Sequence, residues 1–153
     1  MLRARLRNPQ SAILIMPFRT TRRVEFCDTD AAGIVHFSRF FIYMETAEHE
    51  MLRSVGLSVL QPDGDHHLSW PRVAVSCDFR QPAKFDDILT IEVSVERIGS
   101  KSVTYLFRFL RDEQLLATGQ TTAVCCRIVP GQPPVSILIP EEIQTRLASL
   151  PTV

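Results

Sequence analysis

The chain has 153 residues, which is enough for one compact domain with its own hydrophobic core. Hydrophobic residues make up 45% of it and charged residues 22%, the proportions of an ordinary globular protein. Seventeen acidic residues balance seventeen basic ones, which excludes a global charge attraction to nucleic acid or to an acidic membrane surface. The sequence also contains no apolar run long enough to span a bilayer.

The N-terminal segment differs from the rest, because residues 1–24 contain six arginines and no acidic residue. Its short apolar run, residues 12–16, is followed by Pro17 and more arginine, which does not fit a secretory signal. We expect residues 1–16 to be a disordered extension or to precede the true start of the protein, and residues 17–153 to form a single domain. The four cysteines lack C-x-x-C spacing, which indicates free thiols in a reducing compartment and hence a cytoplasmic protein.

The first half of the domain is predicted to contain a strand, a turn-rich loop and a long helix. Residues 19–26 have the pattern of the strand and residues 27–35 that of the loop. From Phe37 onward, apolar side chains recur every three or four residues, which predicts an amphipathic helix of about five to six turns that ends at Gly56. Residues 57–70 contain Pro, Asp and Gly and are expected to be a polar loop.

The second half of the domain has the alternating pattern of β-strands. Strands are expected at residues 73–79, 91–96, 103–110 and 115–129, followed by a proline-rich tail and a short helix after Pro140. One strand, one long helix and four further strands predict an α+β fold, in which a five-stranded antiparallel sheet wraps around the helix. A sheet that covers only one helix leaves an edge and a face exposed, so we expect a homodimer or a homotetramer.

The loop before the long helix is the candidate site for chemistry. It carries Asp28 and Asp30 shortly before Gly33 and leads to the helix start near His36 and Ser38. The first backbone N–H groups of a helix are unpaired and carry partial positive charge, so they can stabilise an acyl oxyanion. A carboxylate held opposite can act as a nucleophile or as a general base. Asp-x-Asp loops are also common as turns and helix caps, so the residues alone leave both roles open.

The same region contains a longer motif. It reads Val24-Glu-Phe-Cys-Asp-Thr-Asp-Ala-Ala-Gly-Ile-Val-His-Phe-Ser-Arg-Phe-Phe, a D-x-D-x-x-G-x-V pattern followed by aromatic residues. Further along are Pro71-Arg-Val-Ala-Val-Ser-Cys-Asp-Phe and Phe85-Asp-Asp-Ile-Leu-Thr-Ile-Glu. In this order the segments resemble the 4-hydroxybenzoyl-CoA thioesterase family over roughly residues 19–129. The resemblance implies the hotdog fold, an acyl-CoA substrate, and no cofactor other than the coenzyme A that is part of that substrate.

The resemblance assigns roles to three residues of the loop and helix start. Asp30 occupies the position of the family's catalytic carboxylate, and Gly33 that of the glycine that lets the backbone turn under the acyl group. Phe37 falls where a backbone N–H contacts the thioester carbonyl. The implied reaction is hydrolysis of a small aromatic or short- to medium-chain acyl-CoA, in which Asp30 attacks the carbonyl or activates water.

Four further residues are candidates for substrate binding. His36 is a candidate for the lining of the acyl pocket, with packing at the helix start as the alternative, and Glu45 stands where family members carry an acid near that pocket. Lys101 and Ser102 match a Lys-Ser dipeptide beside the coenzyme A phosphates. The arginines that precede this dipeptide in the hydroxybenzoyl enzyme are absent here, so other basic side chains would have to complete phosphate binding.

Several polar residues are predicted to have roles outside the active site. Glu48 falls in the apolar stripe of the helix and must be paired or protonated, so we expect a partner-bonded or subunit-interface role, with catalysis from the helix as the alternative. Asp28 is expected to cap the loop. The adjacent His66 and His67 are poorly placed to share one ion, and we expect no metal site.

Two other functions fit the predicted fold. A non-catalytic acyl-CoA-binding or partner-binding module would keep the fold but has no need of Asp30. An acyl-CoA dehydratase would require an Asp–His pair across the thioester, and the helix that begins at His36 and Phe37 lacks the expected spacing.

Overall fold

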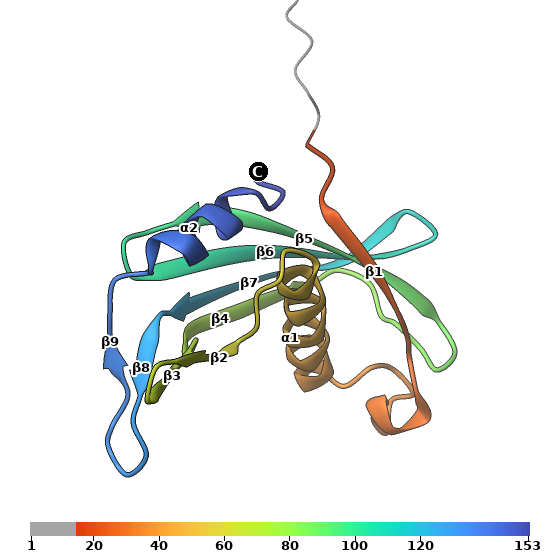
Figure 1. Cartoon of the computed structure of the whole chain (residues 1–153). Helices are drawn as coiled ribbons and strands as arrows, with labels where there is room; N and C mark the ends of the chain where they lie inside the picture. Colours follow the sequence, from red (N-terminus) through yellow and green to blue (C-terminus); the bar gives the residue numbers. More distant parts are fainter. Residues whose placement is uncertain (1–14) are drawn as a thin grey trace, which may run out of the picture.

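The protein is described by a computed structural model, which covers residues 15–153. The extension expected at residues 1–16 therefore lies almost wholly outside the described residues. The main element is a five-stranded antiparallel sheet of order β1-β5-β6-β7-β4, curled around helix α1 (Figure 1), as predicted. Its elements are β1 (Phe18–Arg23), α1 (Phe37–Ser54), β4 (Arg72–Phe79), β5 (Ile88–Ile98), β6 (Ser102–Arg111) and β7 (Gln114–Val124).

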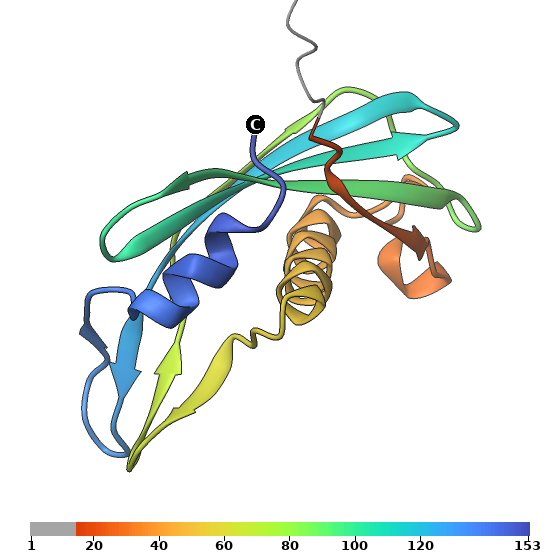
Figure 2. The same ribbon diagram turned by 45° about the horizontal axis from the view of Figure 1, so that its top comes forward.

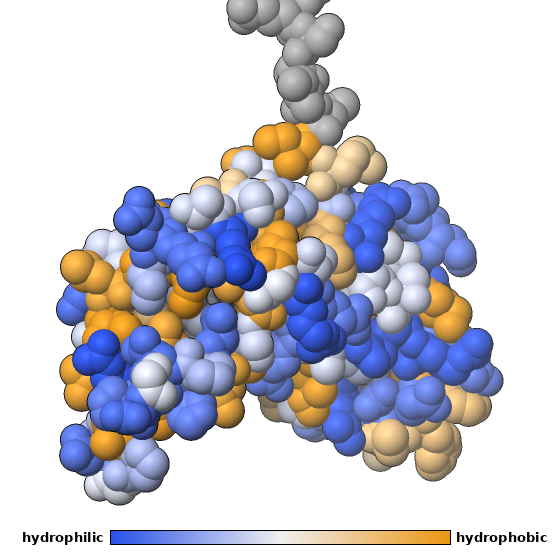
Figure 3. Space-filling view, viewed as in Figure 1, coloured by the Kyte–Doolittle hydropathy of each residue, from blue (hydrophilic) through white to orange (hydrophobic). Residues whose placement is uncertain are grey.

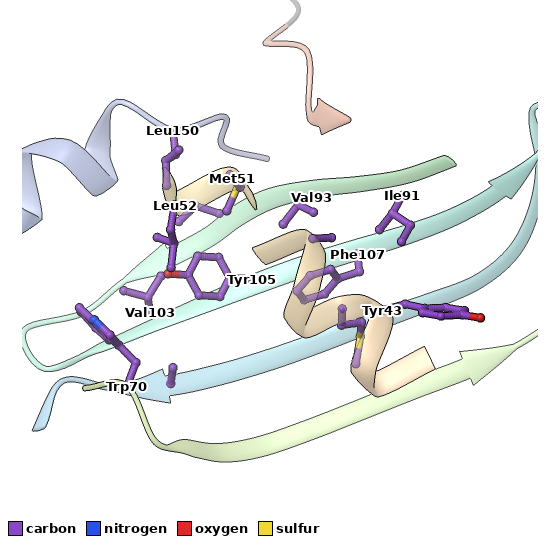
Figure 4. Close-up of a cluster of buried hydrophobic side chains, with 14 of the residues drawn as sticks. Tyr43, Met51, Leu52, Trp70, Ile91, Val93, Val103, Tyr105, Phe107 and Leu150 are labelled. Carbon is purple, nitrogen blue, oxygen red and sulfur yellow. The ribbon is translucent and has the colours of Figure 1, made fainter. Parts of the chain in front are cut away.

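Helix α1 lies across the concave face of the sheet because one of its sides is apolar. Figure 4 shows Tyr43 and Met51 of the helix in one cluster with Phe107 of β6. The close approach of helix and sheet requires Gly119 of β7, since a Cβ at that position would overlap the sulfur of Met44. The helix ends where predicted, before Gly56, which adopts a left-handed backbone with φ of +72°.

A second, four-stranded sheet of order β2-β3-β8-β9 lies at one end of the main sheet (Figure 1) and was not predicted. Its strands are β2 (Leu60–Asp63), β3 (His66–Ser69), β8 (Cys126–Ile128) and β9 (Val135–Ser136). The prediction of a polar loop at 57–70 is wrong, because this segment forms the β2–β3 hairpin and β3 pairs with β8. The single strand predicted at 115–129 is also wrong, since the chain leaves the main sheet after Val124.

The C-terminal helix α2 (Glu141–Ala148) begins after Pro140, as predicted, and packs beside the C-terminal end of α1 (Figure 2). Arg146 of α2 donates to the Gly56 carbonyl at 3.1 Å, and Leu147 is fully buried. Figure 3 shows hydrophilic residues mixed with scattered hydrophobic ones on one face of the molecule. None of the helices within residues 15–153 is long and apolar enough to cross a membrane.

The convex face of β5 is less exposed than its alternating pattern suggests. Glu92 points away from α1, yet it is only 4% exposed. Its carboxylate accepts from Arg19 Nε at 2.9 Å and from Arg108 Nη1 at 2.5 Å. Two arginine side chains on neighbouring strands thus cover a carboxylate that the sequence pattern assigns to solvent.

Strand β4 is one edge of the main sheet, and its apolar face is exposed. Val75, Cys77 and Phe79 share a face, as predicted, and Phe79 is 49% exposed. The prediction is wrong for Val73, because a β-bulge between Arg72 and Ala74 turns its side chain, which is 63% exposed, to the other face of the strand. Val75 is in register with Thr121 on the α1 side of the sheet, so this strip runs beside the helix. Val75 and Phe79 of this strip, together with residues of α1, line the cavities between the helix and the edge strand.

Candidate active site

The loop between β1 and α1 is held by backbone hydrogen bonds. The strand ends at Arg23, three residues earlier than predicted, and Phe26–Asp28 form a 3₁₀ turn. Asp30 N–H donates to the Ile34 carbonyl at 2.9 Å, and Gly33 N–H donates to the Asp30 carbonyl at 2.9 Å. Gly33 has φ of +73°, a left-handed conformation that favours glycine, so the predicted turn is confirmed.

The Asp30 carboxylate is partly exposed and oriented by its own loop. Oδ1 accepts from Ala32 N–H at 2.8 Å, whereas Oδ2 takes part in no hydrogen bond among the described residues. Asp30 lines a cavity of about 430 Å³ together with Phe37 and Phe40 of α1 and Phe79 of β4. One carboxylate oxygen is therefore free to react beside a largely apolar cavity.

The start of α1 borders the same cavity. His36 is the N-cap residue: its Nδ1 lies 2.8 Å from Ser38 Oγ, and its ring stacks on Phe37 with centroids 4.5 Å apart. His36 does not line the Asp30 cavity of the single chain, and its contacts are those of the alternative, packing at the helix start. A role in the acyl pocket stays a prediction. Within residues 15–153 no hydrogen bond uses the Phe37 N–H, which lies at the positive end of the helix dipole.

Asp28, the other acid of the motif, anchors the loop to the helix. It is 8% exposed, and its Oδ2 accepts from Tyr43 Oη at 2.7 Å and from Glu25 N–H at 3.0 Å. Arg39 Nε lies 3.4 Å from Oδ1. Burial and the hydrogen bond to Asp28 raise the pKa of Tyr43. The predicted capping role is thus confirmed. Its partner Tyr43 was missed, because the spacing of apolar residues does not show which side chain of the helix reaches the loop.

Glu48 lies further along α1 and is 1% exposed. Its Oε1 accepts a hydrogen bond from Arg72 Nη2 of β4 at 2.8 Å. Of the roles predicted for Glu48, the structure therefore supports the one in which a partner side chain pairs with it. Burial raises the pKa of Glu48 to about 7, even though the Arg72 guanidinium acts to lower it. Burial and the Arg72 charge also lower the pKa of His49.

A second cavity, of about 310 Å³, opens beside this ion pair. It is lined by Phe41, Ile42, Glu45, Glu48, Arg72, Val75 and Thr121. Glu45 therefore borders this cavity and not the one that contains Asp30. The Thr121 hydroxyl lies close enough to Glu48 to lower the pKa of that carboxyl, but no hydrogen bond of normal geometry joins them, and Glu48 Oε2 and Thr121 Oγ1 are both buried without a partner.

Lys101 and Ser102 lie at the turn between β5 and β6, at the opposite end of the sheet from the Asp30 loop (Figure 2). Strand β5 begins beside that loop, where Val24 N–H donates to the Asp87 carbonyl at 2.9 Å. Its 11 residues then extend for about 36 Å. One chain therefore does not bring Lys101 to Asp30. No group of three His, Cys, Asp or Glu residues that could hold a metal is present among the described residues, and the expectation of no metal stays a prediction.

A sheet curled around one long helix, with an acidic loop at the helix start, defines a hotdog-fold thioester hydrolase. The chain belongs to the thioesterase-like superfamily, whose family model matches residues 24–147.

Three similar proteins support this class. The chain is 30% identical over 128 residues to a putative esterase of Aquifex aeolicus, covering 84% of this chain and 95% of the relative. It is 33% identical over 117 residues to the 1,4-dihydroxy-2-naphthoyl-CoA hydrolase of Prochlorococcus marinus, covering 72% of this chain and 74% of that protein. The crystal structure of the 1,4-dihydroxy-2-naphthoyl-CoA thioesterase of Synechocystis superposes with a TM-score of 0.73 at 27% identity, covering 87% of this chain and 96% of that one. None of these three is named a 4-hydroxybenzoyl-CoA thioesterase, so the comparisons support the superfamily and not that particular branch.

Proposed function

We propose that this chain hydrolyses acyl-CoA thioesters to the free acid and coenzyme A, in the cytoplasm, with Asp30 as the catalytic carboxylate. The observation that carries the proposal is the free Oδ2 of Asp30 in a cavity bordered by the start of α1. Two of the relatives act, by their names, on an aromatic acyl-CoA, which supports an acyl-CoA substrate for this chain. The largely apolar lining suits an acyl group that is aromatic or of short to medium length.

The proposed mechanism uses the Asp30 carboxylate and the Phe37 N–H, which belong to two residues that line the cavity. The Phe37 N–H polarises the thioester carbonyl and stabilises the oxyanion that forms on it, aided by the helix dipole. Asp30 either attacks the carbonyl carbon to give a mixed anhydride, which water then hydrolyses, or takes a proton from the attacking water. Coenzyme A leaves as a thiolate in both routes, so no strong general acid is needed. Gly33 keeps the turn tight enough to hold Asp30 in place.

The test is coenzyme A release, followed with a thiol reagent, from aliphatic and aromatic acyl-CoAs. We expect turnover by the unmodified protein and a loss of about 100-fold or more in Asp30→Asn. The matched control is Asp65→Asn, which makes the same chemical change in the exposed turn of the β2–β3 hairpin and should keep full activity. Full activity in Asp30→Asn would overturn the assignment of the carboxylate. No release from any thioester by the unmodified protein would favour the acyl-CoA-binding module.

We further propose that two copies of the chain pair through the β4 edge. The exposed apolar side chains of β4, Val73 on one face and Phe79 on the other, support this, because an uncovered strand edge with apolar side chains favours pairing. In such a dimer Lys101 and Ser102 would serve the coenzyme A phosphates of another subunit's site. Light scattering should give the mass of a dimer or tetramer and a reduced mass for Val73→Lys. The control Val135→Lys alters an equally exposed valine of β9, 59% exposed against 63%, and should keep the assembly.

A further inference from the structure

The cavity beside Asp30 and the cavity beside Glu48 lie along the same two elements, α1 and β4, and together they are called the groove. Phe37 and Phe40 of the helix line the first, and the next residues along the helix, Phe41 and Ile42, line the second. On the facing strand, Phe79 lines the first cavity and Val75, on the same face of β4, lines the second. The same helix and the same strand therefore line both cavities.

The end of the groove away from Asp30 is lined by two buried polar side chains, Glu48 and Thr121. Glu48 and Thr121 are 1% and 4% exposed, and each contributes an oxygen without a hydrogen-bond partner, Oε2 and Oγ1. Arg72 holds the other oxygen of Glu48 and donates to the Trp70 carbonyl at 2.8 Å, which fixes the carboxylate in place. A buried polar group without a partner costs free energy, so a ligand that supplies one gains that free energy on binding.

The separation of the two ends limits the ligand. Positions 37 and 48 are eleven residues apart on α1, which corresponds to about 16 Å along the helix axis. A single benzoyl ring held with its carbonyl at the Phe37 N–H is too short to reach Glu48. A medium-length acyl chain can span the groove along Phe41, Ile42 and Val75, whose apolar side chains suit methylene groups.

We propose that Glu48 and Thr121 determine the specificity of the acyl groove by binding a hydroxyl group at the far end of a medium-length acyl chain. The inference rests on the proposed thioesterase function and adds the substrate class. One hydroxyl satisfies both free oxygens, because it donates its proton to Glu48 Oε2 and accepts from the Thr121 hydroxyl. Both side chains lie on the α1 side of the sheet, in contact with the groove and not with Asp30.

The charged side chains around this cavity disfavour acyl chains that end in a carboxylate. It contains the carboxyl groups of Glu45 and Glu48 and one guanidinium, that of Arg72. Arg72 is already bonded to Glu48, so an acyl chain that ends in a carboxylate meets an excess of negative charge. A chain that ends in a methyl group leaves the two buried oxygens without partners. The cavity therefore favours a neutral hydroxyl over both.

The experiment compares kcat/KM for decanoyl-CoA, 10-hydroxydecanoyl-CoA and the CoA ester of decanedioic acid. We expect the hydroxylated chain to be preferred over each of the others by about tenfold or more. Thr121→Val keeps the side-chain volume and should reduce this preference by at least about threefold. The double variant Glu48→Met with Arg72→Met removes both charges of the buried ion pair, so no unpaired charge is left, and it should abolish the preference for the hydroxylated chain. Benzoyl-CoA and 4-hydroxybenzoyl-CoA should not be distinguished through Thr121, because the ring does not reach it.

The matched control is Thr104→Val. Thr104 is 5% exposed, comparable to Thr121, but its hydroxyl pairs with Thr122 on the other face of the sheet, so the variant should keep the preference. Hydrolysis without a hydroxyl preference, or a preference that survives Thr121→Val, overturns the inference while the thioesterase function stands. If no acyl-CoA is hydrolysed, calorimetry tests the inference by comparing the affinities for the decyl and 10-hydroxydecyl thioethers of coenzyme A. Tighter binding of the hydroxylated thioether that depends on Thr121 supports the inference, and equal binding overturns it.

Discussion

The two ends of the groove between α1 and β4 hold their acids in opposite ways. Asp30 stands on a loop, partly exposed, with one oxygen fixed by the Ala32 N–H at 2.8 Å and the other free. Glu48 stands in the middle of the helix, 1% exposed, with one oxygen held by Arg72 at 2.8 Å. Both keep one oxygen available, but only the loop acid lies beside unpaired helix N–H groups.

This difference separates reaction from recognition. A carboxylate near water is solvated at little cost and can change its bonding during a reaction, whereas a buried carboxylate must be paired and is fixed by its partner. The loop end therefore suits bond making and breaking, and the helix end suits binding. We therefore expect substitutions around Glu48 to change stability and substrate selectivity, and substitutions around Asp30 to change the reaction rate.

The largest effect on stability should come from breaking the buried pair. Arg72→Met leaves Glu48 without its partner and should lower the free energy of unfolding by about 2–3 kcal/mol at pH 8. The double variant with Glu48→Met should recover most of this loss, because it removes both charges. Urea unfolding measures both. The control Arg23→Met breaks an exposed pair with Asp86, 3.3 Å long, and should cost less than about 1 kcal/mol. Equal losses in the two single variants would contradict the buried role of Arg72.

The next effect is a pH dependence of stability. Burial raises the pKa of Glu48 in the folded protein to about 7, above its ordinary value of 4.5, so the folded protein binds this proton more tightly than the unfolded chain does. Stability from this group is present below pH 4.5 and is lost as the pH rises to 7. The free energy of unfolding should fall by about 2 kcal/mol more in the unmodified protein than in Glu48→Gln between pH 5 and pH 8. Parallel pH profiles for the two proteins would rule this out.

The smallest effect should come from the anchor of the Asp30 loop. Tyr43→Phe removes the 2.7 Å hydrogen bond to Asp28 and should cost about 1 kcal/mol of stability. We expect kcat to fall several-fold with little change in KM, because the loop that carries Asp30 is held less firmly. Tyr105→Phe is the control: among the described residues its hydroxyl makes no hydrogen bond, so kcat should not change on a short-chain substrate. Equal kcat in both variants would remove the anchoring role.

Local patterns predicted the parts of the fold that depend on local interactions. The spacing of apolar residues from Phe37 onward and the glycine at position 56 predicted the bounds of α1. The alternation of apolar and polar residues predicted β5 and β6. The β2–β3 hairpin was missed because Pro62, Gly64 and neighbouring aspartates favour turns, and its strands form through non-local pairing of β3 with β8. The exposure of β4 was not predictable either, because alternation shows which residues share a face but not what covers that face.

The same distinction applies to the site. Asp30, Gly33 and Phe37 lie within eight residues of one another, so the motif that contains them also places them together in space. The need of Glu48 for a partner was evident from its place in the apolar stripe, but the partner Arg72 is 24 residues away and depends on how α1 crosses β4. Lys101 was grouped with Asp30 through the resemblance alone, and a single chain keeps them apart.

The most direct test of the division between the two ends is the ratio of kcat/KM for 10-hydroxydecanoyl-CoA to that for decanoyl-CoA, measured in single turnovers of Asp30→Asn. We expect both values to fall by the same factor, about 100 or more, so that the ratio equals that of the unmodified protein. Loss of the ratio in Asp30→Asn, or rates close to those of the unmodified protein, would contradict the assignment of the reaction to Asp30 and of recognition to the Glu48 end.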